Sequence, residues 1–243
     1  MAAEAGGVKM VANPHSLVLN PAAQAFVEAA DASAHLHDLG PVKGREAVND
    51  VQKDLCHIPV QEMWETIEGG PTGSVRVRVV MPPDAAAPLP AVVYVHGAGW
   101  VFGNAHTHDR LVRELAVQSG AAVVFPEYDL SPEAKYPTAL EQIYATAAWL
   151  AHGGASERVD GSRIAVAGDS VGGNMAIALT FLALQRKEFH LVQLVAFYPV
   201  TDATFETESY RLFAEGYFLR RDTMSWFWDQ YTADETERGQ ITA

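Results

Sequence analysis

A serine flanked by glycines stands at the centre of the segment RIAVAGDSVGGNM, residues 163–175. Ser170 follows an apolar run that is typical of a buried strand, and it precedes residues with helical spacing. Gly168 and Gly172 permit a sharp turn that exposes the serine hydroxyl at the helix N-terminus. The N–H groups at a helix N-terminus lack partners and carry partial positive charge, which favours a developing oxyanion. The pattern predicts a nucleophilic serine, with the N–H of Val171 as one oxyanion donor.

A loop of small residues, HGAGW (residues 96–100), follows another apolar run. The backbone N–H groups of such a loop can point at one place and complete an oxyanion hole. Each motif also has a plainer interpretation, because Ser170 could cap a helix and HGAGW could be a turn with a core tryptophan. The two motifs together, each placed after a buried strand, favour the catalytic interpretation.

The elements that must position these motifs form an alternating pattern of strands and helices. Four valine-rich apolar runs, AVVYV, AAVVFP, RIAVAG and LVQLVAFYPV, are typical of parallel strands buried on both faces. Helices are expected between them over residues 109–118, 138–151 and 171–185. The chain therefore predicts a mostly parallel central sheet with helices on both faces. Ligands bind such sheets at the carboxyl ends of the strands, where Ser170 falls.

Further elements are expected before and after these strands. PAAQAFVEAADASAHLHDL (21–39) predicts a helix that begins at Pro21, and VKGREAVNDVQKDL (42–55) predicts a second one. EMWETIE and SVRVRVVMP predict strands, the latter with Ser74, Arg76 and Arg78 on its more exposed face. The stretch 204–231 is expected to be mostly helical.

Four motifs, HGAGW, YDLSPEAKYPTALEQ, GDSVGG and FYPVTDA, resemble the hormone-sensitive-lipase-like, bacterial family IV branch of the α/β-hydrolases. The resemblance runs from about residue 26 to residue 231. It implies an α/β-hydrolase fold with a helical cap, and a carboxylesterase that hydrolyses short- to medium-chain acyl esters without a cofactor or a metal. It further implies that Ser170 is the nucleophile and that the N–H groups of Ala98, Gly99 and Val171 form the oxyanion hole.

The chain departs from that family's motifs at two places. His96 opens the family's His-Gly-Gly-Gly motif, where it shapes the loop and is not the base, but the middle glycine is Ala98 here. A Cβ restricts positive φ, so the geometry of the hole differs if this residue is left-handed. Val171 replaces the usual alanine and adds bulk beside the scissile carbonyl. We expect a changed rate or acyl preference rather than lost function.

The resemblance also implies a division of the chain. Residues 1–60 form an N-terminal cap segment, 61–203 the hydrolase core, 204–231 a second cap segment and 232–243 a polar tail. Eight aromatic residues of the second cap segment have helical spacing, and most are expected in the core: Phe205, Tyr210, Phe213, Tyr217, Phe218, Trp226, Phe227 and Trp228. An apolar lid would favour an uncharged acyl ester and exclude water.

The base and acid of a serine mechanism are harder to find. A serine hydroxyl needs a histidine to take its proton and a carboxylate to orient that histidine. In this fold the acid and then the histidine follow the serine, yet only His190 does so, before a strand and hence at the wrong edge of the sheet. Asp202 is expected to cap a loop, while His106 and His108 are expected to cap a helix or face solvent. The acid and base are therefore expected beyond residue 243.

The run LVQLVAFYPV supports the same expectation, because it is apolar on both faces and no strand follows to pair with its outer edge. We expect the C-terminal strands of the fold to be missing from this chain. Association with a missing C-terminal segment, or a homodimer, would cover the edge. Low turnover is expected of the 243 residues alone.

Charge and cysteine content exclude several classes of function. A net charge of −13 argues against nucleic acid and against anionic lipid surfaces. A single cysteine, Cys56, allows neither an internal disulfide nor a thiolate metal site. We find neither a signal peptide nor a run long enough to span a bilayer, so a cytoplasmic protein is expected.

Two alternatives to the esterase stay open. The first is a non-catalytic small-molecule binding protein, as in plant gibberellin receptors, which share this architecture and lack the catalytic histidine. The second is an amidase, formamidase or peptidase on the same scaffold. A nucleotide-binding interpretation of GDSVGG is weak, because the chain has no Gly-x-x-x-x-Gly-Lys-Ser/Thr pattern.

Overall fold

The computed structural model of the protein describes residues 12–31, 35–51, 57–86, 88–240 and 242, so Cys56 lies outside the described residues. Two compact units are present. The small unit comprises the described residues of Met1–Gly40 and Thr204–Trp226, and the sheet unit comprises those of Pro41–Ala203 and Phe227–Ala243. Gly40, with φ 70° and ψ 177°, interrupts helix α2 (Leu36–Val51) where the first boundary falls.

The sheet unit is built on six strands in the order β1-β2-β4-β3-β5-β6. Their bounds are β1 Gln61–Glu68, β2 Ser74–Met81, β3 Leu89–Val95, β4 Ala122–Glu127, β5 Val159–Asp169 and β6 Leu191–Phe197. The pairs β1–β2 and β2–β4 are antiparallel, whereas β4, β3, β5 and β6 run parallel to one another. The predicted mostly parallel sheet is confirmed. Since β3 and β5 are neighbours, HGAGW and the turn at Ser170 leave the same edge of the sheet.

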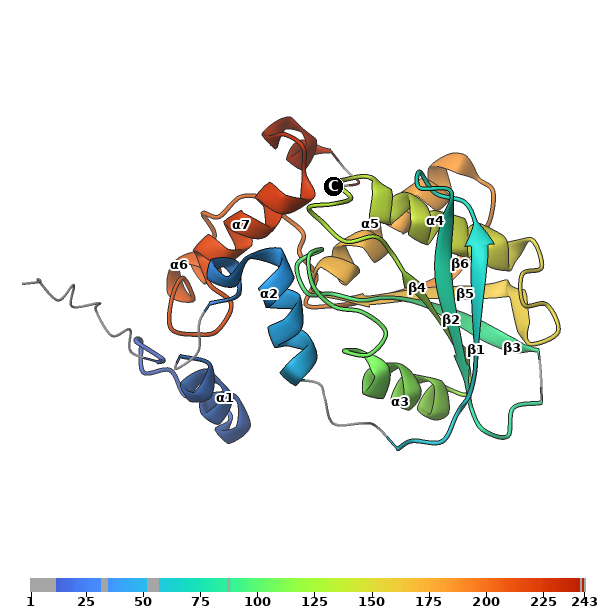
Figure 1. The fold of residues 1–243 in the computed structure, drawn as a ribbon, viewed down its shortest axis with the longest axis horizontal. Helices are drawn as coiled ribbons and strands as arrows, with labels where there is room; N and C mark the ends of the chain where they lie inside the picture. Colours follow the sequence, from blue (N-terminus) through green and yellow to red (C-terminus); the bar gives the residue numbers. More distant parts are fainter. Residues whose placement is uncertain (1–11, 32–34, 52–56, 87, 241, 243) are drawn as a thin grey trace, which may run out of the picture. The chain divides into compact units, whose positions relative to one another are not determined.

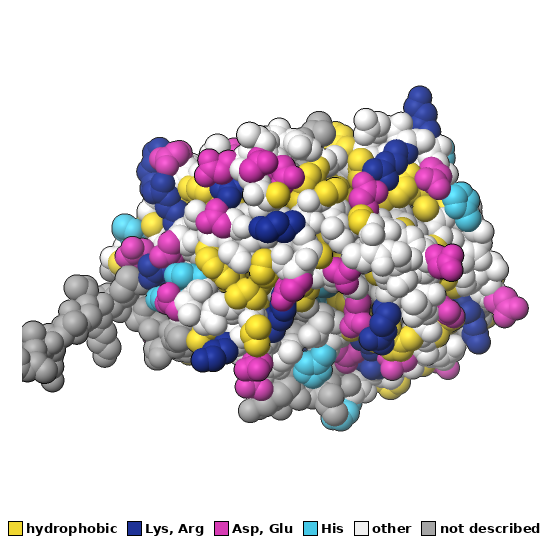
Figure 2. Space-filling model, turned by 45° about the horizontal axis from the view of Figure 1, so that its top comes forward, with side chains coloured by type: hydrophobic (Ala, Val, Ile, Leu, Met, Phe, Trp, Pro, Cys, Tyr) yellow, Lys and Arg dark blue, Asp and Glu magenta, His cyan; other side chains and the backbone are white. Residues whose placement is uncertain are grey.

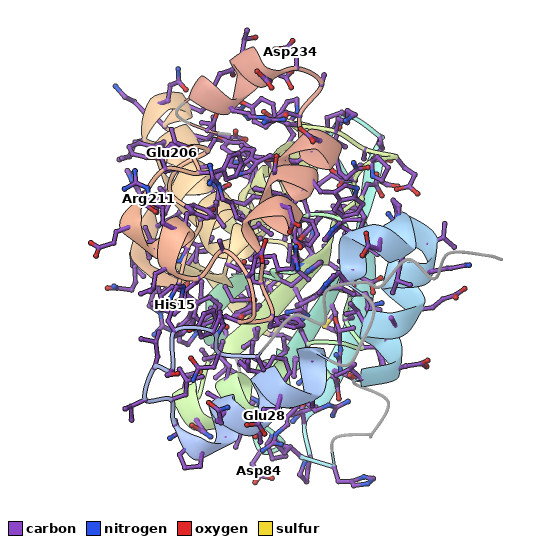
Figure 3. The ribbon with its side chains drawn as sticks, turned by 90° about the vertical axis from the view of Figure 1, so that its left-hand side faces the viewer. His15, Glu28, Asp84, Glu206, Arg211 and Asp234 are labelled. Carbon is purple, nitrogen blue, oxygen red and sulfur yellow. The ribbon has the colours of Figure 1, made fainter. Side chains whose placement is uncertain are left out.

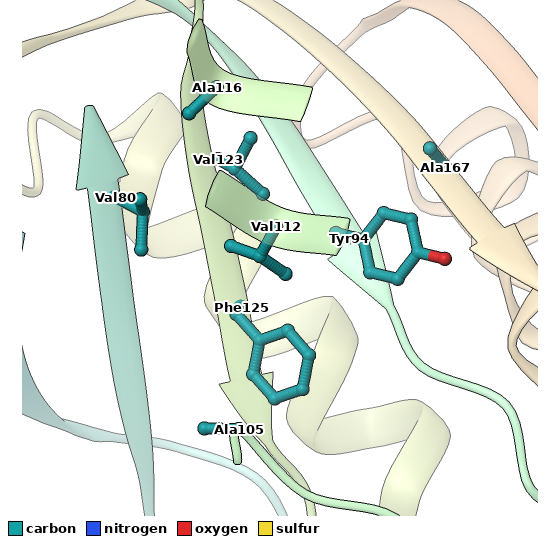
Figure 4. Close-up of a cluster of buried hydrophobic side chains, with 8 residues drawn as sticks. All are labelled: Val80, Tyr94, Ala105, Val112, Ala116, Val123, Phe125 and Ala167. Carbon is teal, nitrogen blue, oxygen red and sulfur yellow. The ribbon is translucent and has the colours of Figure 1, made fainter. Parts of the chain in front are cut away.

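Helices of the sheet unit cover both faces of the sheet, as Figure 1 shows. Helix α3 (Asp109–Ser119) covers one face, and α4 (Thr138–Ala151) and α5 (Val171–Arg186) cover the other. Figure 4 shows Val112 and Ala116 of α3 packed on Val123 and Phe125 of β4. Each fully buried valine or phenylalanine stabilises the fold by about 1.5–3 kcal/mol, so this cluster fixes α3 on the sheet.

Arg78 corrects one expectation. Alternation along β2 placed it on an exposed face, but the structure buries it to 5% exposure. Its guanidinium donates to Glu62 of β1 at 3.0 Å and to Asp109 of α3 at 2.6 Å. Arg113 of α3 donates to the same Asp109 at 2.8 Å. Burial by itself lowers the pKa of Arg78, but these two carboxylates outweigh burial and raise it above its ordinary value.

The small unit joins segments from both ends of the chain. It contains α1 (Pro21–Asp31), α6 (Glu208–Leu212) and the first residues of α7 (Arg221–Tyr231). The side chain of Tyr217 donates to Asn13 at 2.8 Å, and the ring of Phe218 packs against Phe26 with centroids 4.9 Å apart. Glu206 and Arg211, at either end of this α6 region, point outward in Figure 3.

Helix bounds near the N-terminus also differ from the prediction. Pro21 begins α1 as expected, but the single helix predicted over 21–39 is wrong, because α2 already begins at Leu36. The second predicted helix therefore starts earlier, and its residues 52–55 lie outside the described residues. The polar tail forms a short 3₁₀ helix, Glu235–Gly239.

The expectation that most aromatic residues of 204–231 are buried is wrong. Only Phe227 and Trp228 of the eight are fully buried in the described structure, at 4% and 1% exposure. Phe213 and Phe218 are exposed, because the chain between α6 and α7 is not helical and presents no continuous apolar face.

The surface of the molecule carries acidic and basic side chains interspersed over the face shown in Figure 2, rather than a field of one sign. Of the helices in the described ranges, none has the length and hydropathy needed to cross a membrane.

Candidate active site

Ser170 occupies a single-residue turn between β5, which ends at Asp169, and α5, which begins at Val171. Its backbone has φ 55° and ψ −120°, a conformation that is costly for a residue with a Cβ. The Ser170 N–H donates to the carbonyl of Phe197 at 2.9 Å, and the Ser170 carbonyl accepts from Asn174 at 3.1 Å. Strand β6 and helix α5 therefore hold the strained turn.

The side chain of Ser170 makes no capping hydrogen bond with the described N-terminus of α5. The plainer interpretation of this serine as a helix cap needs such a bond. A serine with a strained backbone and a hydroxyl that does not cap the helix is instead what a nucleophile at a helix N-terminus requires.

The oxyanion loop, which we define as residues 96–100, follows β3. Three consecutive residues of it are left-handed: Ala98 at φ 75°, Gly99 at φ 69° and Trp100 at φ 60°. The structure thus brings Ala98 and Gly99, after β3, and Val171, after β5, to the carboxyl ends of two adjacent parallel strands. Their roles as oxyanion donors stay a prediction that this arrangement permits.

The sequence predicts a changed geometry of the oxyanion hole if Ala98 has a positive φ. Its φ is 75°, so the condition is met. A left-handed alanine costs about 1–2 kcal/mol, and glycine relieves that strain while adding about 0.5–1 kcal/mol of unfolded-state entropy. We therefore expect Ala98→Gly to raise the free energy of unfolding by up to about 1 kcal/mol. Urea unfolding followed by tryptophan fluorescence measures this change. A less stable variant would contradict the strain at Ala98.

Aromatic packing supports the far end of the oxyanion loop. The ring of Trp100 stacks on Tyr231 with centroids 4.2 Å apart and planes 3° from parallel, and Trp228 lies 4.7 Å away. Arg45 donates from Nε to the carbonyl of Val101 at 2.9 Å. Trp100 is 1% exposed, so the tryptophan of HGAGW lies in the core, as the plainer interpretation of that motif also had it.

His96 is buried beneath this loop. Its Nδ1 lies 2.9 Å from the carbonyl oxygen of Gly97, which can only accept, so Nδ1 carries the proton. Complete burial and the nearby His108 lower the pKa of His96 to about 3. A neutral imidazole bonded within its own loop shapes that loop and is a poor proton acceptor at pH 7, as the resemblance implied.

Asp169, beside the serine, is a residue that the sequence analysis missed. One carboxylate oxygen, Oδ1, accepts from the Tyr94 hydroxyl at 2.8 Å and from the Gly97 N–H at 3.1 Å. The Nε2 of His108 lies 3.7 Å from the same oxygen. Burial raises the pKa of Asp169, but His108 and the Tyr94 hydroxyl outweigh burial and hold it below its usual value. The adjacent pair Asp-Ser in GDS was the available signal.

His108 also corrects an expectation. It stands at the N-cap position of α3, but its side chain makes no capping hydrogen bond to that described helix. Neither is it exposed to solvent, since the side chain is 15% exposed beside Asp169. The attraction of a partly buried carboxylate, 61 residues further along the chain, is not visible in local sequence. His106, by contrast, is exposed as expected.

The remaining candidates are His190 and Asp202. His190 directly precedes β6, at the amino end of that strand, as the sequence predicted. Asp202 is exposed in the loop after β6 and lines a cavity of about 340 Å³ with Asn174 and Trp228. Ser170 is not among the lining residues, although Asn174 is one helical turn away. Within the described ranges, no group of three or more His, Cys, Asp or Glu residues could hold a metal ion.

Comparison with known proteins decides the family. A sequence profile described as the alpha/beta hydrolase fold matches residues 92–243, which include HGAGW and the turn at Ser170. The chain belongs to the α/β-hydrolase fold family. An esterase of Gibberella moniliformis is 36% identical over 90% of this α/β-hydrolase and 70% of its own length. An ethyl acetate hydrolase of Pseudomonas putida is also 36% identical, over 67% of the chain and 52% of its own length.

Solved structures agree with these relatives. A thermostable esterase from Pseudomonas putida superposes on this α/β-hydrolase with a TM-score of 0.88 at 41% identity, over 92% of this chain and 71% of the other. The resemblance to the hormone-sensitive-lipase-like, family IV carboxylesterases is confirmed. The chain spans 70% of the Gibberella esterase, 52% of the ethyl acetate hydrolase and 61% of a relative from Acanthamoeba polyphaga mimivirus.

Proposed function

We propose that this α/β-hydrolase is a serine carboxylesterase that acts on small, uncharged acyl esters through an acyl-enzyme. The turn at Ser170 carries the proposal, because its strained backbone is held by β6 and α5 while its hydroxyl does not cap the helix. The relatives named as esterases and as an ethyl acetate hydrolase support an ester substrate with a short acyl chain.

In the proposed reaction, Ser170 Oγ attacks the carbonyl carbon of the ester and gives its proton to a general base. The N–H groups of Ala98, Gly99 and Val171 receive the negative oxygen of the tetrahedral intermediate. Each oxyanion donor of this kind is worth about 10²–10³ in kcat. The alcohol then leaves with a proton, and water hydrolyses the acyl-serine by the same route.

The general base and the carboxylate that orients it are predicted beyond residue 243, and this assignment stays a prediction. Burial keeps His96 neutral and bonded to its own loop, and His190 lies at the amino end of β6, so neither is assigned as the base. The helical cap over residues 1–60 and 204–231, the cytoplasmic location and the homodimer also stay predictions.

Covalent capture by an organophosphonate ester tests the nucleophile. The test uses the full-length protein, which would include the base predicted beyond residue 243, because the serine must lose its proton to react with the probe. We expect intact mass to show one phosphonyl group on the protein and none on Ser170→Ala. Ser162→Ala, an exposed serine on the same strand, should be captured as the unmodified chain is. Equal capture of Ser170→Ala, or no capture of the unmodified full-length protein, would refute the assignment.

A further inference from the structure

Asp169 connects the two parts of the candidate site. It is the last residue of β5 and directly precedes Ser170, so its carboxylate moves with the nucleophile turn. The same carboxylate accepts the N–H of Gly97, which lies in the oxyanion loop after β3. Among the hydrogen bonds described above, this one runs directly from the residue beside the serine to the loop that carries Ala98 and Gly99.

The approach of the loop to this carboxylate is close. A Cβ added to Gly97 would lie 2.3 Å from Oδ2 of Asp169 and 2.6 Å from its backbone oxygen, so no side chain fits between the loop and the strand end. Gly97 is therefore required by contact with Asp169.

Tyr94 fixes the carboxylate from below. It is 1% exposed and packs in the cluster beneath α3, and its hydroxyl points out of that cluster toward β5 in Figure 4. Its bond to Oδ1 of Asp169 measures 2.8 Å, the usual length of an O–H···O hydrogen bond. A rigid tyrosine thus sets where Oδ1 lies, and Oδ1 sets where the Gly97 N–H lies.

The charge of Asp169 does not favour the oxyanion. A carboxylate beside the serine repels the negative oxygen that develops on the substrate. Its benefit must therefore be geometric, because oxyanion donors act only when they lie about 2.7–3.1 Å from the oxyanion.

We propose that Asp169 is a positioning residue, whose carboxylate oxygen ties the Gly97 N–H of the oxyanion loop to the turn that carries Ser170. The inference rests on the proposed function, since it assigns the loop its role as an oxyanion hole. It goes beyond that function because it gives a role to Asp169, which the proposed reaction does not use.

Two substitutions separate geometry from charge. Asp169→Ala removes the acceptor for Gly97, so we expect the rate constant of organophosphonate capture at Ser170 to fall by about 10-fold or more. Asp169→Asn keeps an acceptor oxygen for Tyr94 and Gly97 but removes the negative charge, and its capture rate should stay within about threefold of the unmodified chain. Asp160→Asn, at a half-buried acid on the same strand that lies at its other end, is the matched control and should leave the rate unchanged.

Amide hydrogen exchange tests the hydrogen bond from Gly97 to Asp169 independently of the reaction at Ser170. We expect the Gly97 amide to exchange faster in Asp169→Ala than in the unmodified chain and to stay protected in Asp169→Asn. Tyr94→Phe, which keeps the carboxylate but loses its anchor, should give an intermediate rate, and it replaces Asp169→Ala if that variant does not fold.

The outcomes distinguish this inference from the proposed function. Failure to capture the probe at Ser170 in the unmodified full-length protein would refute the esterase, while hydrogen exchange at Gly97 would still test its hydrogen bond to Asp169. Equal loss of capture in the alanine and asparagine variants would show that charge matters, and would overturn the positioning role. Unchanged Gly97 exchange in Asp169→Ala, or in Tyr94→Phe where that variant replaces it, would overturn the inference as well.

Discussion

Replacing Arg78 with methionine is expected to lower the free energy of unfolding by about 3–5 kcal/mol, although the two side chains have similar length. The guanidinium bonds Glu62 of β1 and Asp109 of α3 from a position that is 5% exposed. Without it, both carboxylates depend on Arg113, which lies 2.8 Å from Asp109 and 3.4 Å from Glu62. Because an unpaired charge in a partly buried site is costly, the loss exceeds that of the removed contacts.

Urea unfolding followed by circular dichroism measures this effect, and Arg110→Met on the same helix is the matched control. Arg110 also pairs with a carboxylate, Glu114 at 2.9 Å, but its side chain is 79% exposed. Solvent screens that pair, so the control should change stability by about 0.5 kcal/mol or less. Similar losses in both variants would mean that burial of Arg78 adds nothing to its ion pairs.

Arg78 also shows what the sequence could and could not predict about the fold. Period-two alternation in SVRVRVVMP predicted the strand and its two faces, and β2 contains all of these residues except Pro82. Alternation cannot say what covers the second face. The partners of Arg78 come from 16 residues before it and 31 residues after it, so only the assembled sheet brings them together.

The candidate site divides in the same way. Ser170 was predictable because strand, glycine turn and helix are contiguous, and helices predicted over 109–118 and 138–151 are observed at Asp109–Ser119 and Thr138–Ala151. The sequence shows that Asp169 precedes Ser170, but it does not indicate a role for this residue. Its partners Tyr94 and Gly97 are 75 and 72 residues away, on a neighbouring strand and its loop. Contacts between strand ends depend on strand order, which one sequence does not contain.

The close contact of α5 with β3 carries the second large effect. A Cβ at residue 172 would lie 2.1 Å from the carbonyl oxygen of Val95 and 2.6 Å from that of His96. Both are backbone atoms at the end of β3, and they cannot move aside as a flexible side chain does. Relief therefore requires α5 to withdraw from β3, which displaces the Val171 N–H and the oxyanion loop together.

We expect Gly172→Ala to lower the free energy of unfolding by about 3 kcal/mol or more, at the upper end for overpacking. Urea unfolding measures the loss, and Gly239→Ala is its control, since a Cβ there meets nothing within 4 Å and stability should change by about 0.5 kcal/mol or less. Folded Gly172→Ala should also capture the organophosphonate more slowly, because the shift separates Ser170 from its oxyanion donors. A variant as stable as the unmodified chain would show that helix and strand are not in the contact described, and the turn at Ser170 would lose the support that makes its strained backbone tenable.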